Sequence, residues 1–242
     1  MKQRLAWWLG FDLLRIRKSN SFPALRLQLL RAIEPTLVLD VGANVGQFAR
    51  GVLAYDRNRR VVSFEPVHAS HDRLVRVAQQ SRCPNWYVAP SMAIGRAEGS
   101  AMMNVANYSG CSSLRPMSGT QTAFAPDIVY TGAETVDVRR LDEAAREYVR
   151  NDDRIYLKID TQGYEMDVLE GATGLMDRIV AITLECSFEE MYVGETLALE
   201  LMDHVLSLGF RVFGFCNGGR DPRSKALLYG DIFFVRPDGQ AA

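Results

Sequence analysis

The chain has 242 residues, of which 48% are hydrophobic, enough for one domain with a sizeable core. Its formal net charge of −1 provides no general attraction to nucleic acid, so we expect no nucleic-acid partner. The four cysteines lie far apart without a C-x-x-C pair, which argues against zinc and a disulfide framework and favours a cytoplasmic, reducing compartment. No apolar run reaches the roughly 18–20 residues that span a bilayer.

Residues 1–35 are predicted to be a helical extension that precedes a single domain over residues 36–242. Near its start, apolar side chains recur on one helical face with Lys and Arg around it: Leu5, Trp8, Leu9, Leu13 and Ile16. Such a helix packs on the sheet or on a second subunit, which would give a homodimer, or it lies at a membrane surface. We expect packing, with at most weak peripheral membrane contact. Asp12 interrupts the apolar region, which argues against a signal peptide. A second helix is predicted over residues 21–33.

The domain is organised around residues 36–48, where a short apolar run ends at Asp40 and is followed by Gly42, Gly46 and a helical pattern. The apolar run is typical of a strand buried on both faces. A strand that turns through glycines into a helix lies at the carboxyl edge of a parallel sheet, where open α/β folds bind ligands. Glycine also allows the backbone to approach a ligand closely.

The next predicted strand, residues 61–64, ends at Glu65, whose carboxylate can accept hydrogen bonds from both hydroxyls of a ribose. The dinucleotide fingerprint G-x-G-x-x-G is incomplete, because Asn44 replaces its middle glycine. S-adenosylmethionine has no phosphate, and its zwitterionic methionine end needs only a close, polar loop. The sequence therefore predicts a site for this methyl donor, with a dinucleotide-dependent oxidoreductase as the rival interpretation.

The third predicted strand, residues 86–89, runs into residues 91–95 at the same edge, after a helix predicted over residues 69–80. Side chains of this connection could form a slot for the adenine; the alternative is an ordinary buried connection. The residues expected to hold the donor all lie at strand ends or in the turns that follow them: Asp40, Gly42, Asn44, Gly46, Phe48, Glu65, Pro66, Ser91, Met92, Ala93 and Asp160.

The α/β alternation breaks between residues 99 and 140. Strands are predicted over residues 101–106 and 135–141, and the long polar loop over residues 107–131 is expected to lack regular structure. Loops of this length are usually lids, binding loops or disordered, and we interpret this one as a lid over the acceptor. Its Ser112 and Ser113 are predicted to contact the acceptor.

The alternation then resumes. Helices are predicted over residues 141–149, 165–176 and 195–208, and strands over residues 155–160, 179–185, 210–215 and 231–236. The last two strands are joined by a connection too short for a crossover helix, so an antiparallel pair is expected to close the sheet. The fold class is α/β.

Acidic residues end two of these strands. Asp160 lies beside the first strand end and could act as a base, bind the acceptor or hold the amino group of the donor. Lys158 shares its strand face and either takes part in catalysis or forms a structural ion pair with Asp160 or Glu165. Glu185 is a candidate second catalytic carboxylate, and Gln162 and Glu165 are predicted to contact the acceptor. Asp160 and Glu185 lack a clear third ligand for Mg²⁺, so no metal is expected.

Three segments together carry a resemblance: residues 40–46, the Ser112-Ser113-Leu114 loop and the K-I-D-x-Q-G-x-E pattern within residues 157–165. They resemble the FkbM family of S-adenosylmethionine-dependent methyltransferases, and the likeness covers roughly residues 37–235. The resemblance implies the class I methyltransferase fold, a Rossmann-like three-layer sandwich whose seven-stranded, mostly parallel sheet has one antiparallel strand.

The resemblance also implies an O-methyltransferase that acts on a hydroxyl of a sugar, glycolipid or glycosylated natural product, so the expected partner is a small-molecule or glycan acceptor. Some members of the family methylate carboxyl groups, and this carboxyl O-methylation is the first alternative. A non-catalytic, methyltransferase-like scaffold that binds partners through its N-terminal helix is the second.

Overall fold

The computed structural model describes residues 21–237. The helix predicted within residues 1–18 lies outside this range. Within residues 21–237, every helix is too short or too polar to cross a membrane.

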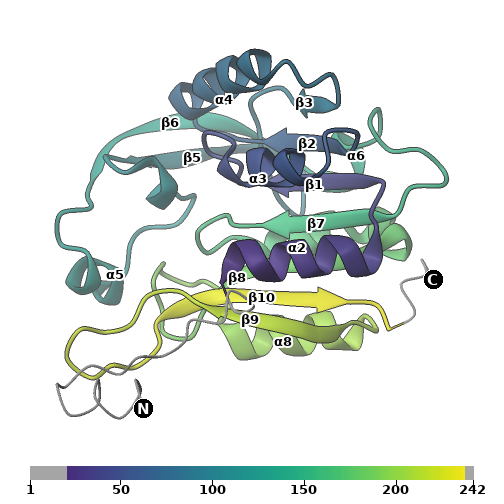
Figure 1. Ribbon diagram of the computed structural model, residues 1–242. Coiled ribbons are helices and arrows are strands. Elements are labelled where there is room, and N and C mark those ends of the chain that lie inside the picture. The colour runs from purple at the N-terminus through teal and green to yellow at the C-terminus, as the bar shows by residue number, and fades with distance from the viewer. Residues whose placement is uncertain (1–20, 238–242) are drawn as a thin grey trace, which may run out of the picture.

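The centre of the fold is a seven-stranded sheet in the order β3-β2-β1-β7-β8-β10-β9 (Figure 1). Its strands are β1 (Leu37–Val41), β2 (Arg60–Phe64), β3 (Trp86–Val88), β7 (Ile155–Ile159), β8 (Ile179–Ser187), β9 (Arg211–Asn217) and β10 (Tyr229–Val235). The pairings among the first five strands of this order are parallel, and β10 runs antiparallel to both β8 and β9. The predicted class I methyltransferase architecture, with one antiparallel strand, is confirmed.

Helices cover both faces because the central strands are apolar on both sides; every residue of β1 and β7 is buried. One face packs against α2 (Phe22–Ile33), α3 (Gln47–Tyr55) and α4 (His68–Ser81). The other packs against α6 (Leu141–Ala144), α7 (Glu165–Gly171) and α8 (Ala198–Ser207). The result is three layers, with the carboxyl ends of the parallel strands gathered at one edge.

Two predicted helices are shorter than expected. The helix predicted over residues 141–149 ends at Ala144, and the chain continues in hydrogen-bonded turns. The helix predicted over residues 165–176 is divided into α7 and the 3₁₀ segment Thr173–Arg178. The last residue of α7 is Gly171, where a Cβ atom would lie 2.2 Å from the carbonyl oxygen of Gly95. Close packing therefore requires glycine at this position, and glycine is a poor helix former, so the helix ends there.

A second, three-stranded sheet in the order β4-β6-β5 lies beside the carboxyl edge of the first. It consists of β4 (Ala93–Ile94), β5 (Gly99–Ala106) and β6 (Tyr130–Arg139). The connection between β5 and β6, predicted to lack regular structure, contains a 3₁₀ turn (Ser109–Cys111) and α5 (Gly119–Phe124). Ser118 caps α5 by accepting hydrogen bonds from two backbone amides, a local device that stabilises even a short helix.

Candidate active site

The turn after β1 is shaped by glycine. Gly42 has a φ of +75°, and a Cβ atom there would lie 1.8 Å from the carbonyl oxygen of Asp160, so no other residue fits. Asn44 and Gly46 also have positive φ angles, of +48° and +84°. The turn therefore brings bare backbone to the junction of β1 and β7.

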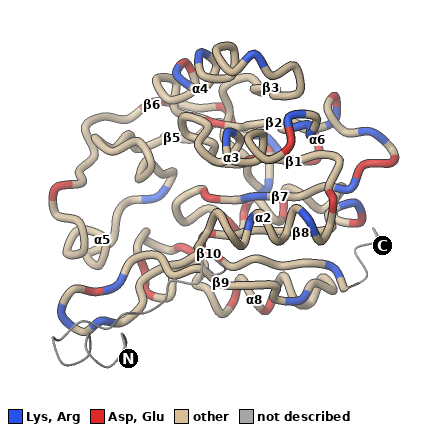
Figure 2. Tube along the Cα trace, in the orientation of Figure 1, with Lys and Arg blue, Asp and Glu red and all other residues tan. Residues whose placement is uncertain are grey.

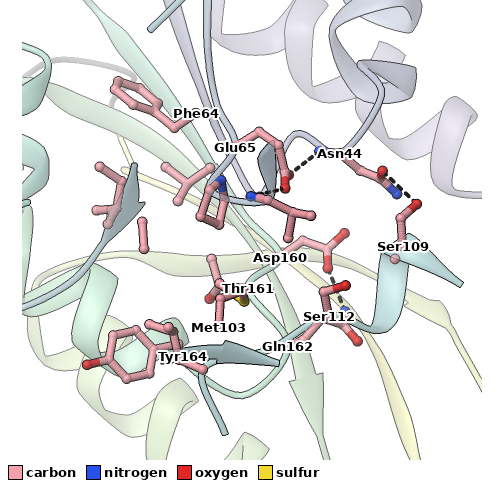
Figure 3. Close-up of a pocket in the computed structure, with 18 of the residues that line it drawn as sticks. Asn44, Phe64, Glu65, Met103, Ser109, Ser112, Asp160, Thr161, Gln162 and Tyr164 are labelled. Atoms are coloured by element: carbon pink, nitrogen blue, oxygen red, sulfur yellow. Dashed lines mark hydrogen bonds between the residues drawn. The ribbon is translucent and has the colours of Figure 1, made fainter. Parts of the chain in front are cut away.

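Glu65 locks this turn against the end of β2. Its carboxylate accepts hydrogen bonds from the backbone amides of Asn44 (2.7 Å) and Val67 (3.0 Å), and Figure 3 shows both. Burial raises the pKa of Glu65 to about 7, against the lowering effect of these two bonds. The carboxylate is thus fixed in position at the wall of a cavity.

That cavity, of about 650 Å³, is here called the first cavity; it lies between the glycine turn, the β2–α4 connection, β4 and the Ser109–Cys111 turn (Figure 3). Of the residues predicted to hold the donor, seven line it: Gly42, Asn44, Glu65, Pro66, Met92, Ala93 and Asp160. Apolar side chains supply the remaining wall, among them Phe64, Ile94 and Met103. The prediction from strand ends thus brings together residues far apart in the chain.

Four residues predicted to contact the donor do not line this cavity. Asp40 is fully buried beneath the turn, and Phe48 is a core residue whose ring packs 5.9 Å from that of Tyr156. Gly46 begins α3 against Trp86, and the Ser91 hydroxyl donates to the carbonyl of Pro66 (2.9 Å). These residues hold the walls in place, a distinction that spacing along a strand does not reveal.

Lys158 lies behind the cavity in an ion cluster. Its Nζ is 3.5 Å from Asp40 Oδ1 and 3.2 Å from Asp160 Oδ2, and it donates to the carbonyl of Gly42 (3.2 Å). Burial alone would lower the pKa of Lys158, but the carboxylates of Asp160 and Asp40 raise it above its usual value. Lys158 lines neither this cavity nor its neighbour, so the geometry favours the predicted structural ion pair over a catalytic role.

A second cavity, of about 880 Å³, adjoins the first. The walls of both include Asn44, Gln47, Gly110, Asp160 and Gln162. The wall of the second cavity also includes the carboxylates of Glu165 and Glu185. Four aromatic rings line it as well, those of Tyr108, Phe124, Tyr192 and Tyr229. None of the described residues in its wall is Lys or Arg.

Neighbouring strands bring carboxylates side by side at this edge. Glu185 of β8 is paired in register with Asp231 of β10, and Asp160 directly follows the last paired residue of β7. Burial, together with the charges of Asp160 and Asp231, raises the pKa of Glu185 well above its usual value. Burial and Asp160 likewise raise the pKa of Asp231 to about 7.

Asp231 was not predicted as a site residue, although a signal for it exists. An acid at the beginning of an antiparallel strand reaches the same edge as an acid at the end of a parallel strand.

Gln162 connects the two cavities. Its Nε2 donates to Asp160 Oδ1 (2.8 Å) and to Glu185 Oε2 (2.5 Å). Its Oε1 accepts from the Tyr192 hydroxyl (2.7 Å), and its carbonyl oxygen accepts from the Ser113 hydroxyl (2.6 Å). The predicted site residue Gln162 therefore touches both candidate catalytic carboxylates.

The other residues predicted to contact the acceptor lie in different places. Ser113 is fully buried and supports Gln162, so it does not contact a ligand directly. Ser112 lines the first cavity instead of the second. Glu165 lines the second cavity, but its Oε1 accepts from the amides of Thr161 (2.9 Å) and Gly163 (3.2 Å), and burial raises its pKa to about 7.

The sequence reasoning also missed the lid contacts. The Ser109 hydroxyl donates to Asn44 Oδ1 (2.9 Å), which joins the lid to the glycine turn (Figure 3). Tyr192 lies in a loop after β8 with no motif of its own, so only the tertiary structure reveals it. Across residues 21–237, the structure shows no group of three or more His, Cys, Asp or Glu residues arranged to hold a metal ion.

The sheet order is that of the class I methyltransferase fold, and the first cavity lies at the carboxyl edge, where open α/β folds bind ligands. Residues 40–212 match the methyltransferase FkbM domain, so the chain belongs to the FkbM methyltransferase family. This membership confirms the expected methyl donor, S-adenosylmethionine. No curated protein matches the sequence.

Solved structures resemble the fold. An FkbM methyltransferase from Methylobacillus flagellatus KT is similar over 90% of this chain, with 17% identity and a TM-score of 0.58; this chain spans about half (47%) of that one. An rRNA methylase from Streptococcus thermophilus has 11% identity over 88% of this chain and 95% of its own, with a TM-score of 0.48. M. capricolum TrmK, in complex with S-adenosylhomocysteine, has 8% identity over 88% of this chain and 68% of its own, with a TM-score of 0.47.

Proposed function

We propose that the protein transfers a methyl group from S-adenosylmethionine to a hydroxyl group of a sugar, glycolipid or glycosylated natural product. The observation that carries this proposal is the second cavity, which adjoins the predicted donor site and is lined by carboxylates, without Lys or Arg among the described residues of its wall.

The first cavity fits the methyl donor. The Glu65 carboxylate is held by two backbone amides and lines the cavity, so its remaining lone pairs suit the ribose hydroxyls. Phe64, Met92 and Ile94 offer apolar surface for the adenine, and the bare backbone at Gly42 suits the polar methionine end. When bound, S-adenosylmethionine supplies an electrophilic methyl group on a positively charged sulfur.

The charge of the second cavity favours a hydroxyl over a carboxyl acceptor. A carboxylate acceptor would have to lie near Asp160 and Glu185 with no described Lys or Arg in the wall to neutralise it. Two like charges 4 Å apart repel by about 4 kcal/mol at the effective dielectric constant typical of sites near a protein surface. A neutral hydroxyl avoids this cost and can donate a hydrogen bond to a carboxylate.

Glu185 is the best placed base. The hydrogen bonds and ion pairs of Asp160 engage both of its oxygens, with Gln162 at Oδ1 and Lys158 at Oδ2. Glu185 lines only the second cavity, and its hydrogen bond within the described residues is at Oε2. Burial raises the pKa of Glu185 above its usual value, which makes its ionised form a stronger proton acceptor, and general-base catalysis typically contributes roughly 10²–10⁴-fold.

Alignment of the methyl donor with the acceptor also accelerates the reaction. The hydrogen bond between Ser109 and Asn44 joins the lid to the glycine turn at the first cavity, and both cavities include Asp160 and Gln162. Holding two reactants in attack geometry can lower a barrier by about 7–11 kcal/mol. The aromatic rings of Phe124 and Tyr229, 6.0 Å apart, provide faces on which a sugar ring or its substituent can lie.

The expected partners and the expected location of the protein are also part of this proposal. Basic and acidic residues are interspersed along the described chain (Figure 2), which supports a small-molecule or glycan acceptor rather than a nucleic acid. A cytoplasmic location, and homodimer or peripheral membrane contact through residues 1–20, stay predictions.

A matched pair of acceptor sets tests the proposal. Neutral methyl glycosides and the corresponding uronic acids are incubated with the protein and methyl-tritiated S-adenosylmethionine, and Glu185→Gln serves as the matched inactive control. We expect label in the neutral glycosides as base-stable ethers. Label confined to the uronic acids as base-labile methyl esters would instead establish carboxyl methylation. Binding of S-adenosylhomocysteine without any transfer would support the non-catalytic scaffold.

A further inference from the structure

Gln162 lies in the turn between β7 and α7 with a φ of +56°, a backbone conformation that is uncommon outside glycine. Residues held in such conformations are retained where the surrounding structure fixes them, and they cluster at functional sites. The Ser113 hydroxyl donates to the Gln162 carbonyl and Arg115 Nε donates to that of Gly163, so the lid side of the site holds this turn.

The partners of the Gln162 side chain assign its orientation. Nε2 faces two carboxylates, which accept hydrogen bonds when ionised, and Oε1 faces the hydroxyl of Tyr192, which can donate. With the amide in this orientation, one N–H goes to Asp160 and the other to Glu185. A flipped amide would place its carbonyl oxygen against both carboxylates.

We infer that Gln162 is a positioning residue that keeps Glu185 ionised and oriented as the proton acceptor, with Tyr192 holding the Gln162 amide in place. This inference rests on the proposed function, since it concerns the base of that reaction. The amide donates to Oε2 and leaves Oε1 to the acceptor. Gln162 acts through Glu185 and need not touch the reacting atoms.

The charges around Glu185 explain why such a donor is needed. The titratable groups that act on it come from β7, β10 and α7: Asp160, Lys158, Asp231 and Glu165. Glu185 in turn acts on nearby groups of the lid, β8, the loop after β8 and β10: Cys111, Cys186, Tyr192 and Tyr229. Lys158 is the cation among these groups. Without the amide, adjacent carboxylates favour a shared proton, and a protonated Glu185 cannot accept another.

Carbon-13 NMR of the side-chain carboxyls measures this directly in the full-length chain. The Glu185 resonance is assigned with Glu185→Gln and titrated in the wild type, in Gln162→Met, in Tyr192→Phe and in the exposed control Gln80→Met. Methionine keeps the length of the side chain and removes both N–H donors. Thermal melting and calorimetry with S-adenosylhomocysteine check that each variant is folded and binds.

We expect Gln162→Met to raise the proton affinity of Glu185 at least tenfold, Tyr192→Phe to raise it about threefold, and Gln80→Met to leave it unchanged. A Gln162→Met protein that is folded and titrates like the wild type would overturn the inference. If Gln162→Met does not fold, Tyr192→Phe decides: a rise of at least twofold supports the inference, and no change overturns it. Failure of the wild type to bind S-adenosylhomocysteine would instead contradict the proposed function.

Discussion

The two cavities share a boundary but are built differently. The walls of the first come from the ends of β1, β2 and β7, from β4 and from the lid, and its Glu65 carboxylate is fixed by backbone amides. The second gathers carboxylates from the β7–α7 turn, α7 and β8, and aromatic rings from the lid, the loop after β8 and β10. The Glu65 carboxylate of the first cavity is fixed by the backbone close to it, whereas the Glu185 carboxylate of the second is held by a side chain from another segment.

This difference separates two kinds of carboxylate. Glu65 is held by hydrogen bonds to the backbone and suits a binding role, whereas Glu185 is held by one side chain and has carboxylate neighbours. We therefore expect mutations in the first cavity to change donor affinity and mutations in the second to change turnover.

The largest expected effect is at Glu185. Glu185→Gln keeps the shape of the side chain and removes the base, so kcat should fall roughly 10²–10⁴-fold. The affinity for S-adenosylhomocysteine should change less than about twofold, because Glu185 does not line the first cavity. Steady-state kinetics with a labelled acceptor and calorimetry check the two halves. Equal losses in kcat and in affinity for S-adenosylhomocysteine would contradict the assignment of turnover to the second cavity and donor binding to the first.

The ion cluster of Lys158, Asp40 and Asp160 allows a test of whether Lys158 has a structural role. Lys158→Met leaves Asp40 and Asp160 without their cation, and breaking a buried pair in this way typically costs about 3–5 kcal/mol of unfolding free energy. Urea unfolding measures the loss, and adding Asp40→Asn in the same chain should restore part of it. A Lys158→Met protein with wild-type stability and no activity would instead support a catalytic role for Lys158.

Glu165 allows a pH test within the second cavity. Because burial raises its pKa from 4.5 to about 7, the folded state binds the proton more tightly than the unfolded state does. The contribution of Glu165 to the unfolding free energy is therefore fully present below pH 4.5 and is lost as the pH rises through 7, by up to about 3 kcal/mol. Glu65 and Asp231 titrate in the same range, so Glu165→Gln should lose less stability than the wild type over this range in urea unfolding, the difference being the share of Glu165. If the unfolding free energies of the wild type and Glu165→Gln changed with pH in the same way, the raised pKa of Glu165 would be refuted.

The smallest expected effect is at Glu65, where we expect the functional loss in donor affinity rather than in turnover. Glu65→Ala removes the proposed acceptor of the ribose hydroxyls, and a hydrogen bond to a charged group contributes about 1.5–3 kcal/mol. Calorimetry should show S-adenosylhomocysteine binding weakened by roughly 10- to 150-fold. The surface variant Glu143→Ala, which loses only an exposed pair with Arg146, should bind like the wild type.

The fold and the strand-end part of the first cavity could be predicted from sequence because their signals are local. The apolar strands and the glycine turn are contiguous, and acids at successive strand ends must meet at one edge of a parallel sheet. The same reasoning could not place Asp40, whose side chain lies beneath the edge rather than at it. Alternation along a strand assigns a face and not the depth at which a side chain meets a cavity.

The second cavity was only partly predictable. Asp160, Gln162 and Glu185 carry a strand-end signal, whereas Tyr192 enters the wall from a loop and Gln121 from α5, where no strand-end pattern points to them. The strand Ala93–Ile94 of the second sheet is too short to give a periodic pattern. The short helix α5, capped by Ser118, was hidden in a polar segment for the same reason.

Calorimetric titration of S-adenosylhomocysteine into the wild type, Glu65→Ala and Glu185→Gln tests the division of labour between the cavities most directly. We predict that the wild type and Glu185→Gln bind with the same affinity and that Glu65→Ala binds far more weakly. A wild type that shows no binding, or a Glu185→Gln variant weakened as much as Glu65→Ala, would contradict it.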